Sequence, residues 1–189
     1  VLVESFADQQ PWMTQLYQRE TGKLLRVGVS HPAIKPAQMG QTDFIRYKAR
    51  DGLDIPAYIT LPAGGVKKNL PLVVLVHGGP WVRGFSWQWD AEVQFLASRG
   101  YAVLQPEFRG STGLGGKHFR AGWKQWGQAM QDDVTDALRF AVQRGWVDAS
   151  RVCIAGASYG GYSTLMGLAK DPDLYRCGVA WVAVSDPRL

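Results

Sequence analysis

The sequence predicts an α/β fold with a mainly parallel sheet and helices on both of its faces. Two observations support this prediction. From residue 72 onward, apolar runs of strand length alternate with longer segments of helical periodicity, a pattern typical of parallel strands connected by helices. In addition, residues 72–76 are apolar throughout, as expected for a strand that is covered on both faces.

The first 38 residues look different and predict a separate unit. Two short extended segments, residues 12–17 and 24–27, flank a turn at residues 20–23 and predict a hairpin. An isolated hairpin is only marginally stable in water, and the neighbouring sequence offers no sheet for it to join. Residues 30–39 contain two prolines and are interpreted as a linker.

A second hairpin is predicted at residues 44–60, where two alternating segments flank Asp51-Gly52, a strong turn dipeptide. The helix predicted at residues 129–144 has one apolar face and ends before Gly145. That face consists of Met130, Val134, Ala137, Leu138, Ala141 and Val142. The other expected elements are strands at 72–76, 101–104, 151–155 and 179–184, and helices at 91–99 and 159–169.

The composition suits a globular protein and excludes several other classes. The 189 residues are 46% hydrophobic and 12% aromatic, which allows a real core and excludes a disordered chain. No apolar run approaches the roughly 18 residues that cross a bilayer, and the first residues show no signal-peptide pattern. The net charge is +5, but the basic residues are dispersed, so nucleic-acid binding is not expected.

Two further predictions concern the state of the cysteines and the cellular compartment. Cys153 and Cys177 lie inside apolar runs, and two cysteines are too few for a disulfide scaffold, so we interpret both as buried thiols. The sequence leaves the compartment open. It is cytoplasmic, or periplasmic or secreted if a signal peptide precedes residue 1.

The most informative segment is residues 152–161, which contains G-x-S-x-G directly between a predicted strand and a predicted helix. In that context the serine occupies a strained turn that exposes its hydroxyl, and Gly156 and Gly160 let backbones approach closely. We therefore predict that Ser158 is a catalytic nucleophile, the alternative being a serine that only caps the helix. The N–H of Tyr159 would then point at the oxyanion, aided by the helix N-terminus.

A second oxyanion donor is expected from the loop after an earlier strand. Residues 77–80 read His-Gly-Gly-Pro, and glycines there allow a main-chain amide to face the substrate carbonyl. We predict the N–H of Gly79 as this donor, with Gly78 as the alternative. His77 follows a buried strand in a loop motif where histidine braces the turn, so we do not assign it as the base.

Two further segments lie near these motifs. Residues 110–118 resemble a phosphate-binding loop, but the pattern fails at Ser111 and His118, so we expect a flexible surface loop without a nucleotide site. A cluster of aromatic side chains follows the His-Gly-Gly motif: Trp81, Phe85, Trp87 and Trp89. The cluster is expected either to line a substrate cleft or to pack the loop against its neighbours.

Three motifs occur in order along the chain: His-Gly-Gly-Pro at 77–80, Phe-Arg-Gly-Ser-Thr-Gly at 108–113 and Gly-Ala-Ser-Tyr-Gly-Gly-Tyr at 156–162. Together they resemble the prolyl oligopeptidase family of serine peptidases, and most closely its acylaminoacyl peptidase and dipeptidyl aminopeptidase branches. The resemblance runs from about residue 43 to the end. Glu107 and Leu114 depart from it, since they stand where the family often has Asn and Tyr.

The resemblance implies an α/β-hydrolase fold, incomplete at its C-terminal end, and a peptidase that cleaves short peptides through an acyl-enzyme at Ser158. Family members carry a β-propeller ahead of the hydrolase domain. Residues 1–38 are therefore interpreted as a propeller remnant with its linker, and residues 39–189 as the N-terminal part of the catalytic domain. A carboxylesterase or lipase of the same fold is the first alternative, and a non-catalytic interaction module is the second.

A serine nucleophile also needs a base and an acid, which follow it in α/β-hydrolases as Asp or Glu and then His. All three histidines precede the serine: His31, His77 and His118. Asp171 and Asp173 fit a solvated loop at a helix end. We therefore expect the chain to stop before both partners and to show little turnover alone. The resulting sheet edge predicts poor solubility or a homo-oligomer.

The expected partner is a peptide substrate, with neither nucleic acid nor membrane. Nothing in the sequence implies a metal or an organic cofactor. Side-chain preference cannot be read from these residues, and neither can the choice between exopeptidase and oligopeptidase.

Overall fold

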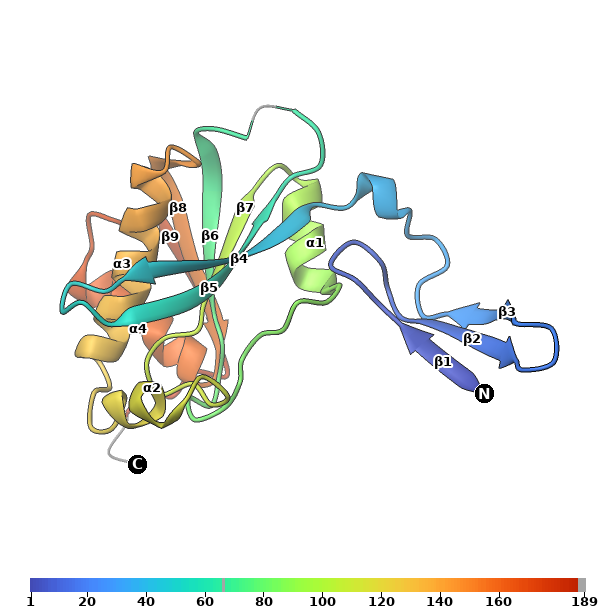
Figure 1. The fold of residues 1–189 in the computed structure, drawn as a ribbon. Coiled ribbons are helices and arrows are strands. Elements are labelled where there is room, and N and C mark those ends of the chain that lie inside the picture. Colours follow the sequence, from blue (N-terminus) through green and yellow to red (C-terminus); the bar gives the residue numbers. More distant parts are fainter. Residues whose placement is uncertain (66, 187–189) are drawn as a thin grey trace.

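The computed structural model describes residues 1–65 and 67–186 and contains two separate β-sheets (Figure 1). The smaller sheet is antiparallel, with β1 (Leu2–Ser5), β2 (Met13–Gln18) and β3 (Lys23–Val29) side by side in that order. The predicted N-terminal hairpin is thus confirmed as β2 and β3. The expectation that no sheet is available to it is wrong, because β1 pairs with β2.

The larger sheet has the strand order β4-β5-β7-β6-β8-β9. Its strands are β4 (Gln41–Lys48), β5 (Asp54–Leu61), β6 (Leu70–Val76), β7 (Ala102–Pro106), β8 (Val147–Ala157) and β9 (Cys177–Trp181). The pairs from β7 to β9 are parallel, whereas β5 is antiparallel to both of its neighbours. The prediction of a mainly parallel sheet is therefore confirmed. The last strand lies earlier than the predicted 179–184, since the chain turns at Val182, where φ is +45°.

Helices cover both faces of the larger sheet, as predicted. The helix α1 (Ala91–Ser98) packs on one face, while α3 (Ala129–Gln143) and α4 (Tyr159–Lys170) pack on the other (Figure 1). Two short helices were not predicted, the 3₁₀ helix η1 (Pro36–Gln38) and α2 (Gly116–Ala121). None of the helices in the described part of the chain could span a membrane.

The side chains of the central strand β6 point alternately to the two faces of the sheet, so both faces must be covered by helices. Leu72, Val74 and Val76 belong to the large core beneath α3 and α4. Val73 and Leu75 belong to a smaller core with α1. All five side chains are buried, so β6 is apolar throughout because both of its faces are in the interior.

The two sheets are joined by hydrogen bonds at Asp8, which lies between β1 and β2. The Asp8 carboxylate accepts from the N–H of Thr42 in β4 at 2.9 Å. The main-chain oxygen of Asp8 accepts from Nε2 of Gln94 in α1 at 3.0 Å. Gln94 also bonds both main-chain groups of Gly40, so this polar joint connects the small sheet to β4 and α1 together.

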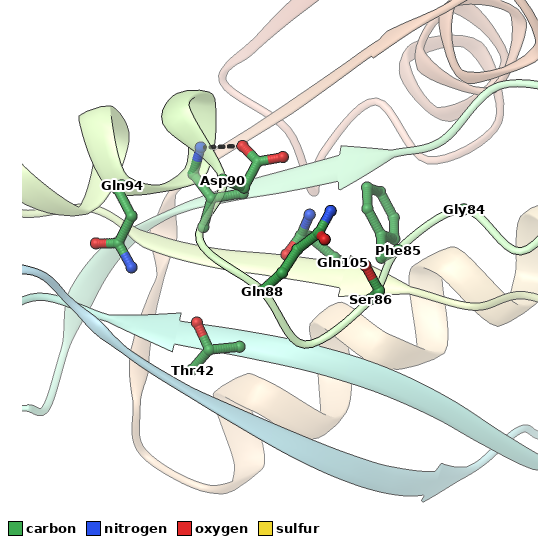
Figure 2. Close-up of a pocket in the computed structure, with 9 residues that line it drawn as sticks. Thr42, Gly84, Phe85, Ser86, Gln88, Asp90, Gln94 and Gln105 are labelled. Atoms are coloured by element: carbon green, nitrogen blue, oxygen red, sulfur yellow. Dashed lines mark hydrogen bonds between the residues drawn. The ribbon is translucent and has the colours of Figure 1, made fainter. Parts of the chain in front are cut away.

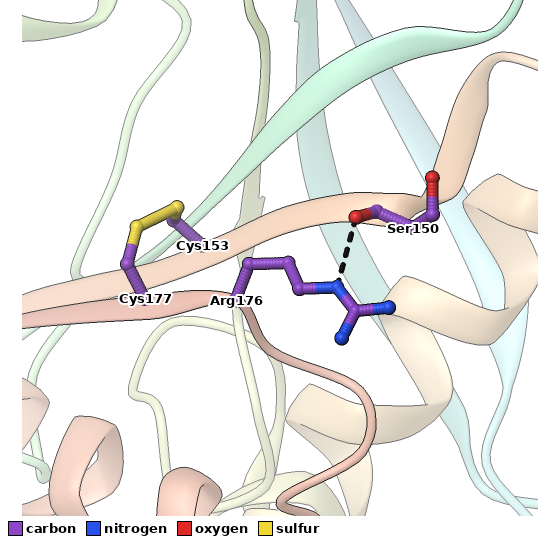
Figure 3. The surroundings of a disulfide bond; sticks show 4 residues. All are labelled: Ser150, Cys153, Arg176 and Cys177. Carbon is purple, nitrogen blue, oxygen red and sulfur yellow. Dashed lines mark hydrogen bonds between the residues drawn. A yellow bond between two sulfur atoms is a disulfide. The ribbon is translucent and has the colours of Figure 1, made fainter.

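The two cysteines form a disulfide, and the interpretation as buried thiols is wrong. Cys153 in β8 and Cys177 in β9 face each other in register, with their Cα atoms 4.7 Å apart (Figure 3). Beside the bond, Nε of Arg176 donates to the main-chain oxygen of Ser150 at 3.1 Å. The pairing depends on β8 and β9 being neighbours, which the spacing of 24 residues does not reveal.

The start of α4 lies directly against the end of β6, and two glycines make this contact. A Cβ on Gly156 would lie 2.5 Å from the main-chain oxygen of Val76 and 2.6 Å from the carbonyl carbon of Gly160. A Cβ on Gly160 would overlap the same Val76 oxygen. The backbones of β6, β8 and α4 can therefore meet only because both positions lack side chains.

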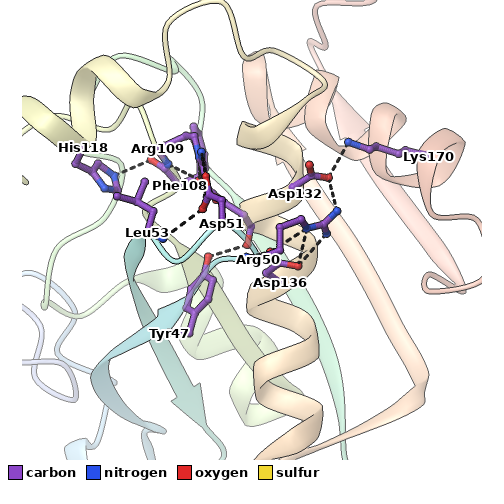
Figure 4. Close-up of polar contacts among 11 residues, drawn as sticks. Tyr47, Arg50, Asp51, Leu53, Phe108, Arg109, His118, Asp132, Asp136 and Lys170 are labelled. Atoms are coloured by element: carbon purple, nitrogen blue, oxygen red, sulfur yellow. Dashed lines mark hydrogen bonds and ion pairs between the residues drawn. The ribbon is translucent and has the colours of Figure 1, made fainter.

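A buried ion pair connects the segment after β7 to α3. Figure 4 shows its arginine, Arg109, together with Asp51. Arg109 binds Asp133 through Nε and Nη2, each at 2.8 Å, and its main-chain N–H donates to the same carboxylate at 2.8 Å. The Asp133 side chain is 0% exposed and that of Arg109 is 7% exposed. Arg109 also binds Asp51 in the hairpin between β4 and β5. This cluster thus ties together three segments that are distant in sequence.

We expect Gly160→Ala to lower the free energy of unfolding by about 3 kcal/mol or more, because the added methyl overlaps main-chain atoms that cannot move independently. Urea denaturation would measure the loss. Gly28→Ala is the matched control, since a Cβ there meets nothing within 4 Å, and it should change stability by less than about 0.5 kcal/mol. Equal midpoints for the two variants would contradict this packing.

Asp133→Asn should lower the free energy of unfolding by about 3 kcal/mol, because it leaves a buried guanidinium without its main countercharge. Burial raises the pKa of Asp133 to about 6, so urea denaturation is best done at pH 8, where the carboxyl is ionised. Asp136→Asn in the same helix is the control, with an expected loss of about 1 kcal/mol or less, because its partner Arg50 is 45% exposed. Similar losses in both variants would contradict the assignment.

Candidate active site

Ser158 lies at the sharp turn between β8 and α4, at the carboxyl ends of the parallel strands. Its backbone angles are φ +55° and ψ −118°, a conformation that L residues rarely adopt and that persists only where the surroundings hold it. The residue is exposed, and its hydroxyl makes no bond that caps α4. The alternative interpretation of Ser158 as a helix cap is therefore wrong.

Three main-chain hydrogen bonds hold this turn. The N–H of Ser158 donates to the oxygen of Trp181 at 3.2 Å. Its carbonyl oxygen accepts from Tyr162 at 3.0 Å and from Val184 at 3.3 Å. Because Trp181 and Val184 flank the bend after β9, that segment and the first turn of α4 fix the Ser158 backbone while its side chain stays free.

Gly78 of the His-Gly-Gly loop (residues 77–85) lies beside Ser158. A Cβ on Gly78 would be 3.4 Å from Cβ and 4.0 Å from Oγ of Ser158, so Gly78 faces the serine directly. Gly79 follows at φ +114°, where a Cβ would lie 2.9 Å from Cγ2 of Val82. Tyr159, the first residue of α4, contributes one of the amides that have no partner within a helix. The N–H groups of Gly79 and Tyr159 are those that the sequence predicts as oxyanion donors.

The Tyr159 side chain anchors the first turn of α4 in an aromatic cluster. Its ring is 1% exposed. The ring centroids of Trp126, Phe108 and Tyr162 lie 4.7, 5.2 and 5.7 Å from it. Burial raises the pKa of the Tyr159 hydroxyl, so the ring is neutral at every physiological pH. The side chain therefore acts in packing.

His77 braces the loop, as predicted. Its Nδ1 lies 2.7 Å from the oxygen of Gly78, and its Nε2 lies 3.0 Å from Oγ of Ser111. The ring stacks on Phe108 at 4.3 Å and meets the edge of Phe85 at 5.4 Å. Burial lowers the pKa of His77 to about 4, so the imidazole is neutral at pH 7. A histidine enclosed in this way is a structural part of the loop.

The aromatic side chains at residues 81–89 support the packing interpretation. Phe85 packs on His77, and the ring centroids of Trp81 and Phe119 lie 5.9 Å apart. The indole N–H of Trp87 donates to the oxygen of Thr42 at 3.1 Å, and that of Trp89 approaches the sulfur of Met39 at 3.5 Å. These bonds fasten residues 81–89 to β4 and to the segment before it.

The segment at residues 110–118 is only in part the surface loop that we expected: Gly113 and residues 115–117 are exposed, but both ends are buried. Ser111 is fully buried. His118 is 5% exposed, and its Nε2 lies 3.0 Å from the main-chain oxygen of Phe108. The N–H of Thr112 donates to the oxygen of Val82, so the segment also supports the His-Gly-Gly loop. The cause is the helix α2, which folds the glycine-rich stretch back onto the body.

Each of the three histidines makes contacts elsewhere in the described part of the chain. His77 and His118 are enclosed, and His31 stacks on Trp89 at 4.5 Å. Among the aspartates after the serine, Asp173 is exposed as predicted. Asp171 differs from the solvated loop residue that we expected, since it is half-buried and accepts from Oγ1 of Thr135 at 2.8 Å. The described residues hold no cluster suited to a metal ion.

The sequence suggested no role for Glu107, and the structure places it at the centre of the loop contacts. Its side chain is 0% exposed, and its carboxylate accepts from the N–H groups of Gly84 and Phe85. The available signal was a lone charged residue within the mostly apolar stretch 101–108. Glutamate is almost never fully buried unless it is paired, so such a position merits attention in a sequence.

Comparisons with known proteins agree with this architecture. Residues 87–189 match the prolyl oligopeptidase family. The chain is 38% identical over 192 residues to dipeptidyl aminopeptidase BIII of Pseudoxanthomonas mexicana, and 35% identical over 209 residues to dipeptidyl peptidase family member 6 of Caenorhabditis elegans. Each alignment covers 98% of this chain but only 28% of the relative.

The solved structures show the same fold. A puromycin-hydrolyzing peptidase of Mycobacterium tuberculosis superimposes with a TM-score of 0.86 at 26% identity, over 99% of this chain and 29% of that protein. The α/β-hydrolase fold expected from the motifs is thus confirmed. The family match covers more than half of the residues, and on that basis the chain belongs to the prolyl oligopeptidase family.

Proposed function

We propose that this chain carries the nucleophile of a serine peptidase, with Ser158 attacking the scissile carbonyl of a short peptide. The observation that supports this most is the geometry of Ser158, an exposed serine at φ +55° between a parallel strand and a helix. That backbone is the strained elbow for which G-x-S-x-G is suited. Family membership adds the reaction class.

The chemistry proceeds in two steps. Ser158 Oγ loses its proton to a base and bonds the carbonyl carbon, and the N–H groups of Tyr159 and Gly79 stabilise the oxyanion. The base then protonates the leaving amine, the C–N bond breaks, and an acyl-enzyme remains on Oγ. Water repeats the sequence and releases the acid. Gly78 is the alternative donor, because it lies beside Ser158.

We propose that the base is a histidine outside residues 1–189, oriented by an acid that also lies outside them. The three histidines of the chain are each engaged elsewhere. The relatives that match are more than three times as long as the aligned segment. Without base and acid, the oxyanion donors alone give little turnover, so the 189-residue chain should be nearly inactive by itself.

Ser158→Ala should abolish fluorophosphonate labelling of the protein at its natural length, because the probe bonds an activated serine oxygen. Labelling would be followed by gel fluorescence and by mass spectrometry of the peptide that contains residue 158. Ser86→Ala, at another exposed serine near the loop, is the matched control and should label like the wild type. Undiminished labelling of Ser158→Ala would refute the assignment.

A peptidase should hydrolyse dipeptidyl nitroanilides as well as short-chain nitrophenyl esters. Amide cleavage requires a protonated leaving amine, whereas the phenolate of a nitrophenyl ester leaves unaided, so the amide is the demanding substrate. Comparing kcat/KM for both classes on the full-length protein would decide between the two functions. Turnover of esters alone would favour the carboxylesterase alternative and overturn the peptidase proposal.

A further inference from the structure

Glu107 is a buried carboxylate that the proposed chemistry does not use. It comes directly after β7, and its main-chain N–H is fixed by the oxygen of Pro56 at 2.9 Å. Oε1 accepts from the N–H of Phe85 at 2.6 Å, and Oε2 accepts from the N–H of Gly84 at 3.3 Å. Two consecutive amides of the His-Gly-Gly loop thus converge on one carboxylate.

The bonds to Glu107 hold the main-chain N–H groups of Gly84 and Phe85. Phe85 has two further contacts, since its oxygen accepts from Nε of Arg83 at 3.1 Å and its ring packs against the smaller core of Val73 and Leu75. Gly84 and Phe85 line a small polar pocket of about 60 Å³ together with Ser86, Gln88 and Gln105 (Figure 2). A hollow gives little packing energy to the backbone beside it. Gly84 lies against the His77 ring, so a shift of residues 84–85 would displace His77 and the glycines that follow it.

The groups that face Glu107 come from three elements. Nε of Arg83, in the loop, lies 3.4 Å from Oε1, and Nε2 of His77, at the end of β6, lies 3.6 Å from Oε2. His118 in α2 is close enough to interact electrostatically, and burial lowers its pKa as it does that of His77. With both histidines neutral at pH 7, Arg83 is the countercharge among the described residues. It also donates to the hydroxyl of Tyr58 at 2.8 Å.

We propose that Glu107 is a positioning residue whose ionised carboxylate holds the His-Gly-Gly loop so that its glycine amide meets the oxyanion. The inference rests on the proposed function of Ser158 and goes beyond it, because it makes oxyanion stabilisation depend on the charge of a residue that never touches substrate. Protonated Glu107 loses the ion pair with Arg83 and one of its two acceptor oxygens, which loosens residues 83–85.

The direction of the pH dependence follows from burial, which raises the pKa of Glu107 above its ordinary 4.5. Because the folded pKa is raised, the folded state binds this proton more tightly than the unfolded state does. Glu107 therefore contributes most to stability below its unfolded pKa, and the contribution falls as pH rises through the folded pKa. This group therefore does not unfold the protein on acidification. Reactivity at Ser158 should fall for a different reason, because the neutral carboxyl loses its ion pair with Arg83 and one acceptor oxygen.

The test measures the rate of fluorophosphonate labelling of Ser158 from pH 4.5 to 8 in the full-length wild type and in Glu107→Gln. The ratio of the two rates cancels any ionisation that they share, including that of the catalytic histidine. We expect the variant to react about tenfold more slowly at pH 8, short of the 10²–10³-fold cost of removing an oxyanion donor. The two rates should converge as pH falls, because the wild-type carboxyl becomes neutral too.

Asp90→Asn is the matched control, since Asp90 begins α1 at the other end of the same segment and Asn is an equally good helix cap. Its rate ratio to the wild type should stay constant with pH. Arg83→Gln, at a side chain 37% exposed, removes the countercharge without emptying the interior and should move the acid limb to higher pH. A pH-independent ratio for Glu107→Gln, or an unmoved limb in Arg83→Gln, would overturn the proposal.

Hydrogen exchange of the peptide that contains residues 84–85 separates this proposal from the function of Ser158. Once corrected for the intrinsic effect of pH, its protection should fall on acidification in the wild type and stay low in Glu107→Gln. Protection that does not respond to either change would overturn the role of Glu107. Absence of Ser158 labelling at every pH, with the exchange pattern intact, would instead refute the proposed function.

Discussion

Main-chain contact between the end of β6 and the first turn of α4 sets the geometry on which the candidate site depends. The contact exists because Gly156 and Gly160 have no side chains that would collide with the oxygen of Val76. It places the loop after β6 and the turn after β8 within a few ångströms of each other. Neighbouring parallel strands always end at the same edge of a sheet, but only this contact brings their loops together at Ser158.

Buried charged side chains also hold together the segments that surround the site. Arg109 and Asp133 connect the segment after β7 to α3, and Glu107 connects that segment to the His-Gly-Gly loop. Burying ions is costly, and they stabilise a structure only when hydrogen bonds satisfy them fully. Here the carboxylates accept main-chain N–H groups as well as guanidinium groups, which fixes the loops that carry those N–H groups.

Local patterns predicted most of the fold and the centre of the site. The period of α3 and the apolar run of β6 are properties of a few consecutive residues, so both elements could be located from the sequence. The strand–turn–helix context around Ser158 is equally local. The helix α2 was missed because it spans six residues and begins with glycine, which disfavours helices.

The remaining features depend on which strands are neighbours, and no local pattern contains that information. The disulfide needed the adjacency of β8 and β9, and β1 needed the partner strand β2, whose paired residues lie 8 to 14 positions away. Burial of Glu107 could not be expected from its residue type, because it follows from the way that the loops after β6 and β7 fold over each other. At these positions, contacts between distant segments determine the structure, and the local sequence does not.

The joint at Asp8 has a consequence for how such a protein can change during evolution. The Asp8 carboxylate binds Thr42 in β4, the strand farthest from β8 in the sheet order, and the Asp8 carbonyl binds Gln94 in α1. Such a joint mainly requires that the N-terminal unit supply two correctly placed oxygen atoms. A different N-terminal unit that supplied those oxygens could replace the small sheet and leave the core beneath the serine as it is.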